Sequence, residues 1–389
     1  MDFRLTDEQR EIKESVAKFA RNEIAPHADT WDAEKRFPRE IFKPLADLGL
    51  AGILVPEELG GMELPRLMGA VIYEQLARAD FATAVWVSVH NMVTGLIARY
   101  GNEEQRQRWV PRMAGGELIG AFSLSEAHAG SDAANLQTSA RREGDHYVVN
   151  GSKYWVTNAG VADIYTVMVR TTPGRAARGI TTLVVERDTP GFNVGKVEHK
   201  MGMHASPTGE LIFEGCRIPV ENRLGEEGEG FKIALASLDG GRVNVGANSV
   251  GVAQAAFDVA TRYAQEREAF DQPIGAFQGI QFMLADMAMK IEAARLLVYE
   301  AASKMDEGDP AATMHAAMAK CFATDVAMEV TTNAVQVLGG AGYVRDWPVE
   351  RYMREAKVGQ IVEGTNQIQR LVIARALLGA AAGSVSKRR

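Results

Sequence analysis

The chain has 389 residues, of which 46% are hydrophobic and 24% are charged, and its formal net charge is -7. This length indicates two or three domains, and the composition is typical of a soluble globular protein that buries a large core without disulfides. The acidic balance gives no electrostatic support for bulk binding to nucleic acid or anionic lipid, although a local basic pocket for a phosphorylated ligand stays open.

Few residues suit a metal or redox centre. The two cysteines, Cys216 and Cys321, lie among apolar neighbours outside any CxxC pair, which indicates reduced structural thiols in a reducing compartment. The seven histidines show no HxxxH or HExxH spacing, so no metal site is expected. Neither a secretory h-region nor a run of about 18 uncharged apolar residues is found, so we expect a cytoplasmic location and no membrane span.

The first part of the chain, residues 1–118, is predicted to be helical. Thr6 and Gln9 have the spacing of a capping box, and residues 82–100 are apolar at helical spacing. From residue 230 to the end, apolar residues again recur every three to four positions. This periodicity predicts a bundle of about four long helices.

Between these helical parts, residues 119–229 are rich in β-branched residues and turn signals. Two turns are predicted, at Glu143-Gly144-Asp145 and, as a hairpin, at Asn150-Gly151. The strands that we expect are residues 147–149, 154–157, 164–170, 180–186 and 209–213. Short antiparallel strands without intervening helices suggest a sandwich or barrel, so the fold class is mostly α with a central β domain.

Glu363 is the candidate catalytic residue. It lies in the turn before an expected helix, whose start we assign to Asn366 with Gln369 as its capping partner. The apolar pair Ile361-Val362 precedes it, and Gly364 lets a backbone or a ligand approach closely. A carboxylate in apolar surroundings has a raised pKa, which suits a general base. A glutamate at this place is more often a partner of the helix dipole, so the residues alone leave both roles open.

Two segments of the β region could bind a flat ligand. The loop 125–132 gathers small residues and hydroxyls at a strand end, so it can present N–H groups to a ring edge or a phosphate; a plain polar loop is the alternative. Strand alternation puts Trp155 and Thr157 on one face, where they could stack on a heteroaromatic ring and hydrogen-bond to it. The alternative is that Trp155 belongs to the core.

Two glycine-containing segments of the helical region could also approach a ligand. Residues 338–343 could contact a pyrophosphate, but they lack the Rossmann spacing and could equally form a turn between two helices. Asp239 and Arg242 share one helix face across Gly240-Gly241, and each glycine costs about 1 kcal/mol relative to alanine. Close packing of a ligand or of another helix would explain these glycines.

Together these segments resemble the acyl-CoA dehydrogenase family over nearly the whole chain. The motifs that carry the resemblance are Gly151-x-Lys153-x-Trp155-Val156-Thr157-Asn158, Arg267-x-x-Phe270, Gln278, Gly339-Gly340-x-Gly342-Tyr343 and Glu363-Gly364-Thr365-Asn366. The loop at Ser125 departs from the family's Thr-Glu-Pro pattern at Ala127-His128. The resemblance implies an N-terminal α-helical domain (1–118), a middle β-barrel (119–229), a C-terminal four-helix bundle (230–389), FAD as cofactor and a homotetramer.

The resemblance also implies the residues of the site. Those expected to contact FAD are Phe122, Leu124, Ser125, Gly130, Ser131, Trp155, Val156, Thr157, Arg267, Phe270, Phe277, Gln278, Gln336, Val337, Gly339, Gly340, Thr365, Asn366 and Gln367. Those expected to contact the CoA ester are Ser131, Asp239, Arg242, Gly364 and Arg375. Trp155 would shield one flavin face, Thr157 would bond near N5, and an adjacent subunit would contribute Arg267 and Gln278.

The activity that the resemblance implies is α,β-dehydrogenation of an acyl-CoA to the trans-2-enoyl-CoA. Glu363 would remove the α-proton as the β-hydrogen leaves as hydride to flavin N5, and electrons would pass to electron transfer flavoprotein. Some branched-chain relatives carry the base at the position of Gly241, so Glu363 has no competitor here. We therefore expect a short- or medium-chain substrate, or an isobutyryl-type one, in fatty acid or branched-chain amino acid catabolism.

The subgroup and the reaction class both have alternatives. Residues 88–92 and 239–242 resemble isobutyryl-CoA dehydrogenases, whereas residues 283–290 resemble medium-chain members. An acyl-CoA oxidase is less expected because such oxidases usually carry a further C-terminal domain. Flavin-binding relatives with other activities tend to lose the base, and a non-catalytic CoA-ester-binding module would lose the FAD contacts.

Overall fold

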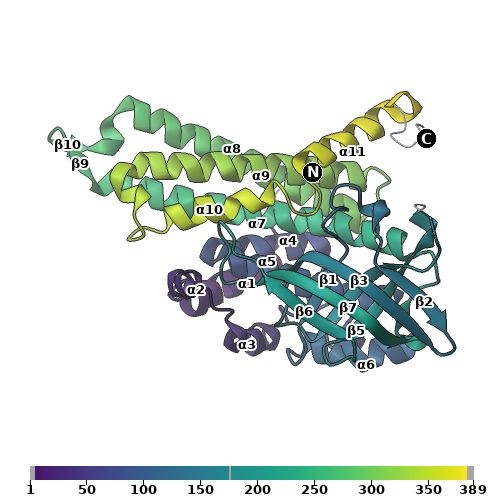
Figure 1. Cartoon of the computed structure of the whole chain (residues 1–389). Coiled ribbons are helices and arrows are strands. Elements are labelled where there is room, and N and C mark those ends of the chain that lie inside the picture. The colour runs from purple at the N-terminus through teal and green to yellow at the C-terminus, as the bar shows by residue number, and fades with distance from the viewer. Residues whose placement is uncertain (1–4, 175–176, 383–389) are drawn as a thin grey trace. The chain divides into compact units, whose positions relative to one another are not determined.

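The computed structural model describes residues 5–174 and 177–382, which group into two compact units (Figure 1). The helical unit comprises the chain up to Asp29, residues 66–84 and residues 242 onward. The sheet unit comprises residues 30–65 and 85–241.

The helical unit is an assembly of long helices. Its helices are α1 (Asp7–Phe19), α4 (Arg66–Ala79), the larger part of α7 (Gly230–Glu266), α8 (Gln278–Asp306), α9 (Ala312–Leu338), α10 (Val349–Gly359) and α11 (Asn366–Leu378). Helices α8 and α9 lie side by side, and α10 and α11 pack against α9 (Figure 1). The predicted capping box is confirmed, because the Thr6 and Gln9 side chains each accept the other's backbone N–H at 3.2 and 3.0 Å.

Apolar stripes of these helices form the core of the helical unit. On α8 the predicted period is confirmed, since Ile291, Ala294 and Val298 are buried. Helix α7 approaches α8 closely at Gly246, where an added Cβ would lie 2.9 Å from the side chain of Val298. Burial of one stripe per helix, rather than intrinsic propensity, stabilises helices of this kind.

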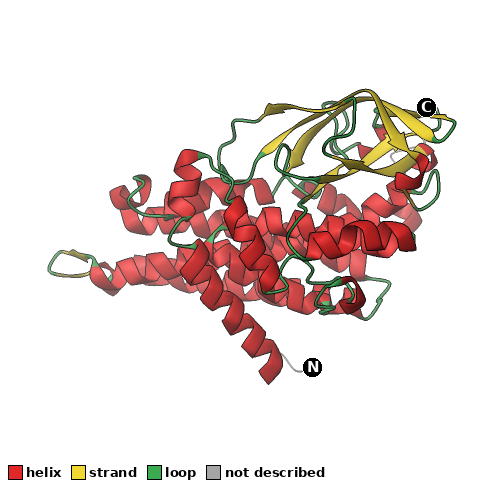
Figure 2. Ribbon diagram, turned by 90° about the horizontal axis from the view of Figure 1, so that it is seen from below, coloured by secondary structure: helices red, strands yellow, loops and turns green. Residues whose placement is uncertain are grey.

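The sheet unit contains one mixed sheet and several helices (Figure 2). Its strands are β1 (Gly120–Ser123), β2 (Ser139–Glu143), β3 (His146–Thr157), β4 (Ile164–Arg170), β5 (Ile180–Glu186), β6 (Phe192–Val197), β7 (Thr208–Pro219) and β8 (Arg223–Leu224). The order is β6-β7-β3-β2-β4-β5-β8, with β1 parallel to β4. Its helices are α3 (Phe42–Asp47), α6 (Glu103–Ala114) and parts of α2 (Ala28–Glu34), α5 (Phe81–Tyr100) and α7.

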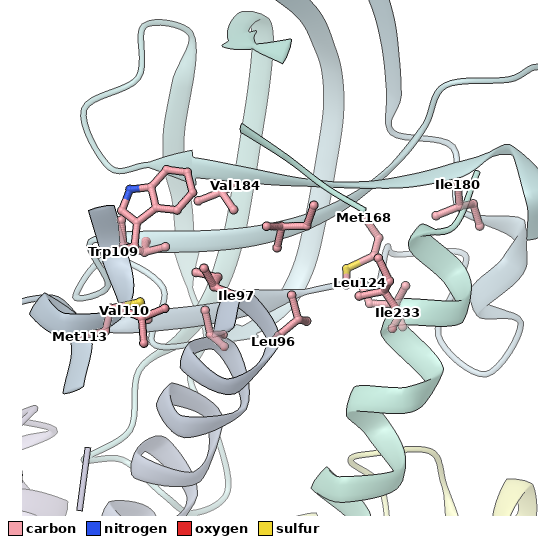
Figure 3. Packing of buried hydrophobic residues seen from close by; sticks show 14 of the residues in the cluster. Leu96, Ile97, Trp109, Val110, Met113, Leu124, Met168, Ile180, Val184 and Ile233 are labelled. Atoms are coloured by element: carbon pink, nitrogen blue, oxygen red, sulfur yellow. The ribbon is translucent and has the colours of Figure 1, made fainter. Parts of the chain in front are cut away.

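The core of the sheet unit lies between its helices and one face of the sheet (Figure 3). Trp109 of α6 is buried and donates its indole N–H to Glu186 of β5 at 2.9 Å, which ties helix to sheet. The core includes Leu96, Ile97, Trp109, Val110, Met113, Leu124, Met168, Ile180, Val184 and Ile233. Helix α5 is long and apolar enough to cross a membrane, but 83% of its apolar window is buried, as in a core helix.

The predicted strands 164–170 and 180–186 are confirmed, and so is the turn at Gly144. The predicted hairpin at Asn150-Gly151 is wrong, because β3 runs through both residues. Gly151 has φ +136°, and an added Cβ would lie 2.8 Å from the Thr138 backbone. Asn150 accepts the N–H of Gly215 at 2.8 Å. Both residues therefore serve a bulge and a close approach inside the sheet instead of a turn.

Candidate active site

Glu363 lies in a tight turn between α10 and α11. Its φ is +54° and that of Gly364 is +86°, so two consecutive residues are left-handed. For glutamate this conformation costs roughly 1 kcal/mol or more. The cap of α11 is Thr365, whose Oγ1 accepts the N–H of Ile368 at 3.3 Å. The helix therefore begins at Asn366 as predicted, but its cap is Thr365, and the Asn366 and Gln369 side chains have other partners.

Three donors hold the two carbonyl groups of this turn. Gln369 Nε2 donates to Glu363 O at 2.9 Å and to Gly364 O at 2.8 Å. Lys320 Nζ of α9 donates to Gly364 O at 2.9 Å. Arg242 Nε of α7 forms a long hydrogen bond of 3.5 Å to Glu363 O. These contacts over-determine the backbone, which is how a left-handed glutamate persists in a fold.

The Glu363 carboxyl group is desolvated. Its Oε2 is buried and has no hydrogen-bond partner among the residues that the structure describes. Burial raises the pKa of Glu363 to about 7, against the positive charges of Arg242 and Lys320, which lower it. The group can therefore gain or lose a proton near neutral pH, as a general base must.

Asn366 connects the turn to α9. Its Nδ2 donates to Asp325 Oδ1 at 2.7 Å and to Cys321 O at 3.3 Å, and its Oδ1 accepts from Lys320 Nζ at 2.8 Å. Among the residues 365–367 that we expected to contact FAD, the Asn366 amide is thus already used within the chain, whereas the Gln367 side chain is exposed.

The predicted glycine turn joins α9 to α10. Helix α9 ends at Leu338, and Gly339–Tyr343 form a 3-10 turn. An added Cβ at Gly339 or Gly340 would meet nothing within 4 Å among the described residues, so there is open space beside both glycines. Gln336 is exposed on the last turn of α9, whereas Val337 is buried and packs inward.

The residues Arg267, Phe270, Phe277 and Gln278 cluster at a hairpin between α7 and α8. Strands β9 (Glu268–Ala269) and β10 (Gln272–Pro273) pair across Phe270 and Asp271, which have φ values of +54° and +60°. Both figures show this hairpin projecting from the end of the helices (Figures 1 and 2). Phe270 is 88% exposed and contacts Phe277 edge to face at 6.0 Å.

In the sheet unit, Trp155 is strained and exposed. It has φ +56° at a register shift between Lys153 and Val156 in the β3–β7 pairing. Its side chain is 53% exposed, so the alternative interpretation of Trp155 as a core residue is wrong. Because Trp155 lies at this bulge, regular strand alternation does not set its direction. After the bulge, Val156 is buried and Thr157 is partly exposed. An added Cβ at Gly130 would lie 4.0 Å from the indole.

The loop before Gly130 is held by a buried lysine. Glu126 and Ala129 exchange backbone hydrogen bonds, which closes a turn with Ala127 and His128 exposed at its tip. Lys153 Nζ donates to Leu124 O at 3.1 Å and to Glu126 Oε1 at 2.8 Å. The departure from the family's pattern therefore falls at an exposed turn tip.

The remaining residues expected at the site differ in location and exposure. Phe122 is partly buried on β1, Ser125 accepts the backbone N–H of Tyr154 at 2.9 Å, and Ser131 and Arg375 are exposed. Arg242, expected at the CoA ester, is instead nearly buried against the Glu363 turn. Asp239, on the same helix, is partly exposed.

Sequence reasoning missed the supporting roles of three polar residues in these loops: Lys153 and Gln369, which it named only in a motif and as a capping partner, and Lys320, which it did not name. A signal existed for Lys320, because it is the one lysine on an alanine-rich face of α9 whose neighbours Ala316, Ala319 and Ala323 are buried. The two cysteines are buried free thiols, as expected. In the described ranges, His, Cys, Asp and Glu do not gather in threes or more where they could hold a metal ion.

Comparison with known proteins gives a consistent result over the chain. Three family models match: the acyl-CoA dehydrogenase N-terminal domain at residues 6–117, the middle domain at 121–216 and the C-terminal domain at 228–378. The chain is 48% identical to a probable acyl-CoA dehydrogenase, FadE25, of Mycobacterium tuberculosis, over 97% of each chain. It is 45% identical to the mitochondrial isobutyryl-CoA dehydrogenase of Dictyostelium discoideum, over 96% of this chain and 90% of that one.

A solved structure agrees. The butyryl-CoA dehydrogenase of Megasphaera elsdenii superposes with a TM-score of 0.94 at 44% identity, and the match covers 97% of this chain and all of that one. The resemblance inferred from the motifs and the expected fold are confirmed. The chain is an oxidoreductase that belongs to the acyl-CoA dehydrogenase family.

Proposed function

We propose that the protein catalyses FAD-dependent α,β-dehydrogenation of a short-chain acyl-CoA, with Glu363 as the base. The observation that carries this proposal is the Glu363 carboxyl group itself. It has a buried, unpartnered oxygen and a pKa raised to about 7, and it is held in a strained turn. Buried structural glutamates find partners, so a carboxylate with one oxygen buried and unpartnered is suited to accept a proton.

FAD is the cofactor that membership of this family implies. In each unit, residues on the expected list fit a flat dinucleotide. Trp155 presents an exposed indole from a strained bulge, and Gly339 and Gly340 adjoin open space. Bound FAD supplies the acceptor for the hydride that leaves the β-carbon.

The chain's own residues act on the proton. The unprotonated Glu363 carboxylate would take the α-proton of the thioester, and its backbone N–H would donate to the thioester oxygen as negative charge develops there. Arg242 and Lys320 keep the pKa of the carboxyl group from rising further. The acyl chain excludes water from the site, which strengthens these interactions.

A second copy of the chain completes the site in this proposal. Arg242 contacts the Glu363 turn, whereas Arg267 follows the far end of α7. The 24 residue-to-residue steps from Arg242 to Glu266 span about 36 Å of helix, so one chain cannot bring the hairpin to its own base. The apolar residues Phe282, Met289 and Leu296 are exposed at seven-residue intervals on α8, as at a helix interface. In a homotetramer, another subunit would supply the hairpin and cover the exposed apolar residues of α8.

The substrate in this proposal is a short straight-chain or isobutyryl-type acyl-CoA, because relatives of both kinds match. The run 88–92 does not separate them. His90 bonds Ala51 O at 3.0 Å and Asn91 donates to Leu50 O at 2.8 Å, so this run supports a loop of the sheet unit. At the position where some branched-chain relatives carry the base, this chain has the buried Gly241, which has no side chain to act as a base. Glu363 therefore remains the proposed base. We further propose electron transfer flavoprotein as the electron acceptor and, from the buried thiols, a cytoplasmic location.

The test is anaerobic mixing of the purified yellow holoprotein with butyryl-CoA and isobutyryl-CoA, followed by flavin absorbance. Wild type should bleach, and Glu363→Gln should retain FAD and bleach at least about a thousandfold more slowly. Glu104→Gln, at an exposed position on α6, is the matched control and should behave as wild type. Normal bleaching of Glu363→Gln would reject the proposal. Faster reoxidation by oxygen than by electron transfer flavoprotein would instead indicate an acyl-CoA oxidase.

A further inference from the structure

Lys320 is a fully buried lysine on α9. Lysine is almost never fully buried unless its ammonium is paired. Here the ammonium donates to Gly364 O at 2.9 Å and to Asn366 Oδ1 at 2.8 Å. The two acceptors lie one and three residues after Glu363, so the buried lysine supports the segment that carries the proposed base.

Packing alone does not explain this residue. Its neighbours on the buried face of α9 are alanines, and an apolar side chain of similar length would avoid the desolvation of a cation. Desolvation lowers the pKa of Lys320 to about 8. The charges around it are Glu363, Cys321 and Asp325, which oppose this shift, and Arg242, which adds to it; Glu363 has the largest effect among them.

The Glu363 carboxylate depends on its backbone for its position. Its Oε2 has no hydrogen-bond partner among the described residues, so side-chain contacts at this atom do not fix it. Besides the long contact from Arg242, the backbone is fixed by a neutral donor from α11, Gln369, and by the charged donor from α9, Lys320, which share the Gly364 carbonyl. The two differ in one respect, because only Lys320 adds a positive charge.

We propose that Lys320 is a positioning residue for Glu363: its ammonium holds the Gly364 carbonyl from the α9 side and places a buried positive charge beside the carboxylate. The inference deepens the proposed function and rests on Glu363 being the base. Two cations face Glu363, Arg242 from α7 and Lys320 from α9, and both lower its pKa against the effect of burial. Loss of one of them must therefore raise that pKa.

The expected size follows from the ordinary effect of a nearby opposite charge, which is about one pH unit. If the pKa of Glu363 rises from about 7 to about 8, the ionised fraction at pH 7 falls about fivefold. The acid limb of the pH profile for flavin bleaching should move upward by the same unit. A merely structural lysine would lower stability without moving this limb.

The test compares three variants of the FAD-loaded protein. Lys320→Met keeps the apolar stem and removes both donor and charge, and Gln369→Leu removes the neutral donor to the same carbonyls. Lys304→Met, whose partner is Asp309 at 2.8 Å, is the control for loss of a lysine from the helical unit. The carboxyl pKa is read by infrared difference spectroscopy against Glu363→Gln without substrate, and the pH profile is read by anaerobic bleaching.

We expect Lys320→Met to raise the carboxyl pKa by about one unit and to shift the acid limb with it. Gln369→Leu should slow bleaching with a smaller pKa change, and Lys304→Met should leave both readouts unchanged. A wild-type carboxyl pKa and acid limb in folded Lys320→Met would overturn the inference while leaving the proposed function intact. If Lys320→Met does not fold, Lys320→Gln, which keeps a neutral donor, must show the same pKa rise.

The infrared readout separates this inference from the proposed function. If wild type itself fails to bleach with any acyl-CoA, the proposed function fails. The carboxyl pKa of Lys320→Met still decides whether the lysine acts on Glu363.

Discussion

Gly364→Ala should destabilise the protein more than an equivalent change elsewhere in the helical unit. Gly364 has φ +86°, so alanine there carries the cost of a left-handed side chain, about 1 kcal/mol. The new Cβ would also lie 2.8 Å from Gln369 Nε2, which donates to both carbonyls of the turn. Displacing that amide removes two hydrogen bonds worth about 1 kcal/mol each, so the total loss is about 3 kcal/mol.

Gly308 provides the matched control. It lies just after α8 with φ +66°, and an added Cβ there would meet nothing within 4 Å among the described residues. Gly308→Ala therefore carries the left-handed cost of about 1 kcal/mol alone. The difference between the two variants isolates the contribution of Gln369.

Urea unfolding of both variants measures this difference as a change in the free energy of unfolding. The dependence of that free energy on urea concentration should be the same in both variants. Bleaching by acyl-CoA gives a second readout, because a carboxylate displaced by about 1 Å loses about a hundredfold in rate. Equal losses of stability in Gly364→Ala and Gly308→Ala would refute the reasoning that Gln369 clamps the turn.

Three further changes test other parts of the molecule. Asp80→Ala removes the carboxylate 2.9 Å from the buried Arg351 guanidinium, which keeps only Asp29 and Glu355, and should cost about 3 kcal/mol in urea, whereas Asp258→Ala, in an exposed ion pair, should cost under about 1 kcal/mol. The pKa of Glu363 is raised to about 7, so its ionisation destabilises the fold as pH rises from about 4.5 to 7. Glu363→Gln should therefore be more stable than wild type at pH 8, by on the order of 3 kcal/mol, but not at pH 4. If the proposed assembly forms, Phe270→Ala should weaken it and FAD retention in light scattering and absorbance; an unchanged molecular mass with full flavin content would contradict a role at the interface.

Local patterns predicted the regular elements well, because their signals are local. Strands β4 and β5 match their expected ranges, since continuous β-branched runs bounded by turns have few alternatives. The Asn150-Gly151 hairpin failed for a tertiary reason. The same two residues satisfy a bulge against Thr138, which no local pattern reveals.

The candidate site was predictable only as a set of motifs. Glu363 was identified from its apolar surroundings and from the family resemblance. The donors that hold it, Lys320 and Gln369, come from α9 and from the buried face of α11, and nothing in the spacing of 44 or 6 residues signals a contact. The partners of buried polar residues are set by the tertiary fold. Hydrophobic periodicity therefore shows only that such a residue interrupts an apolar face, and it does not predict which group the residue contacts.

The reactivity of Glu363 reflects a balance between two opposing environments. Burial alone would raise its pKa so far that little carboxylate existed at neutral pH, and two fully effective cations would lower it until the carboxylate became a weak base. The pKa of about 7 lies between these limits because burial raises it while the charges of Arg242 and Lys320, which contact the carbonyls of the turn, lower it. The same donors that fix the backbone therefore set the strength of the base, and a single change at either cation must alter both.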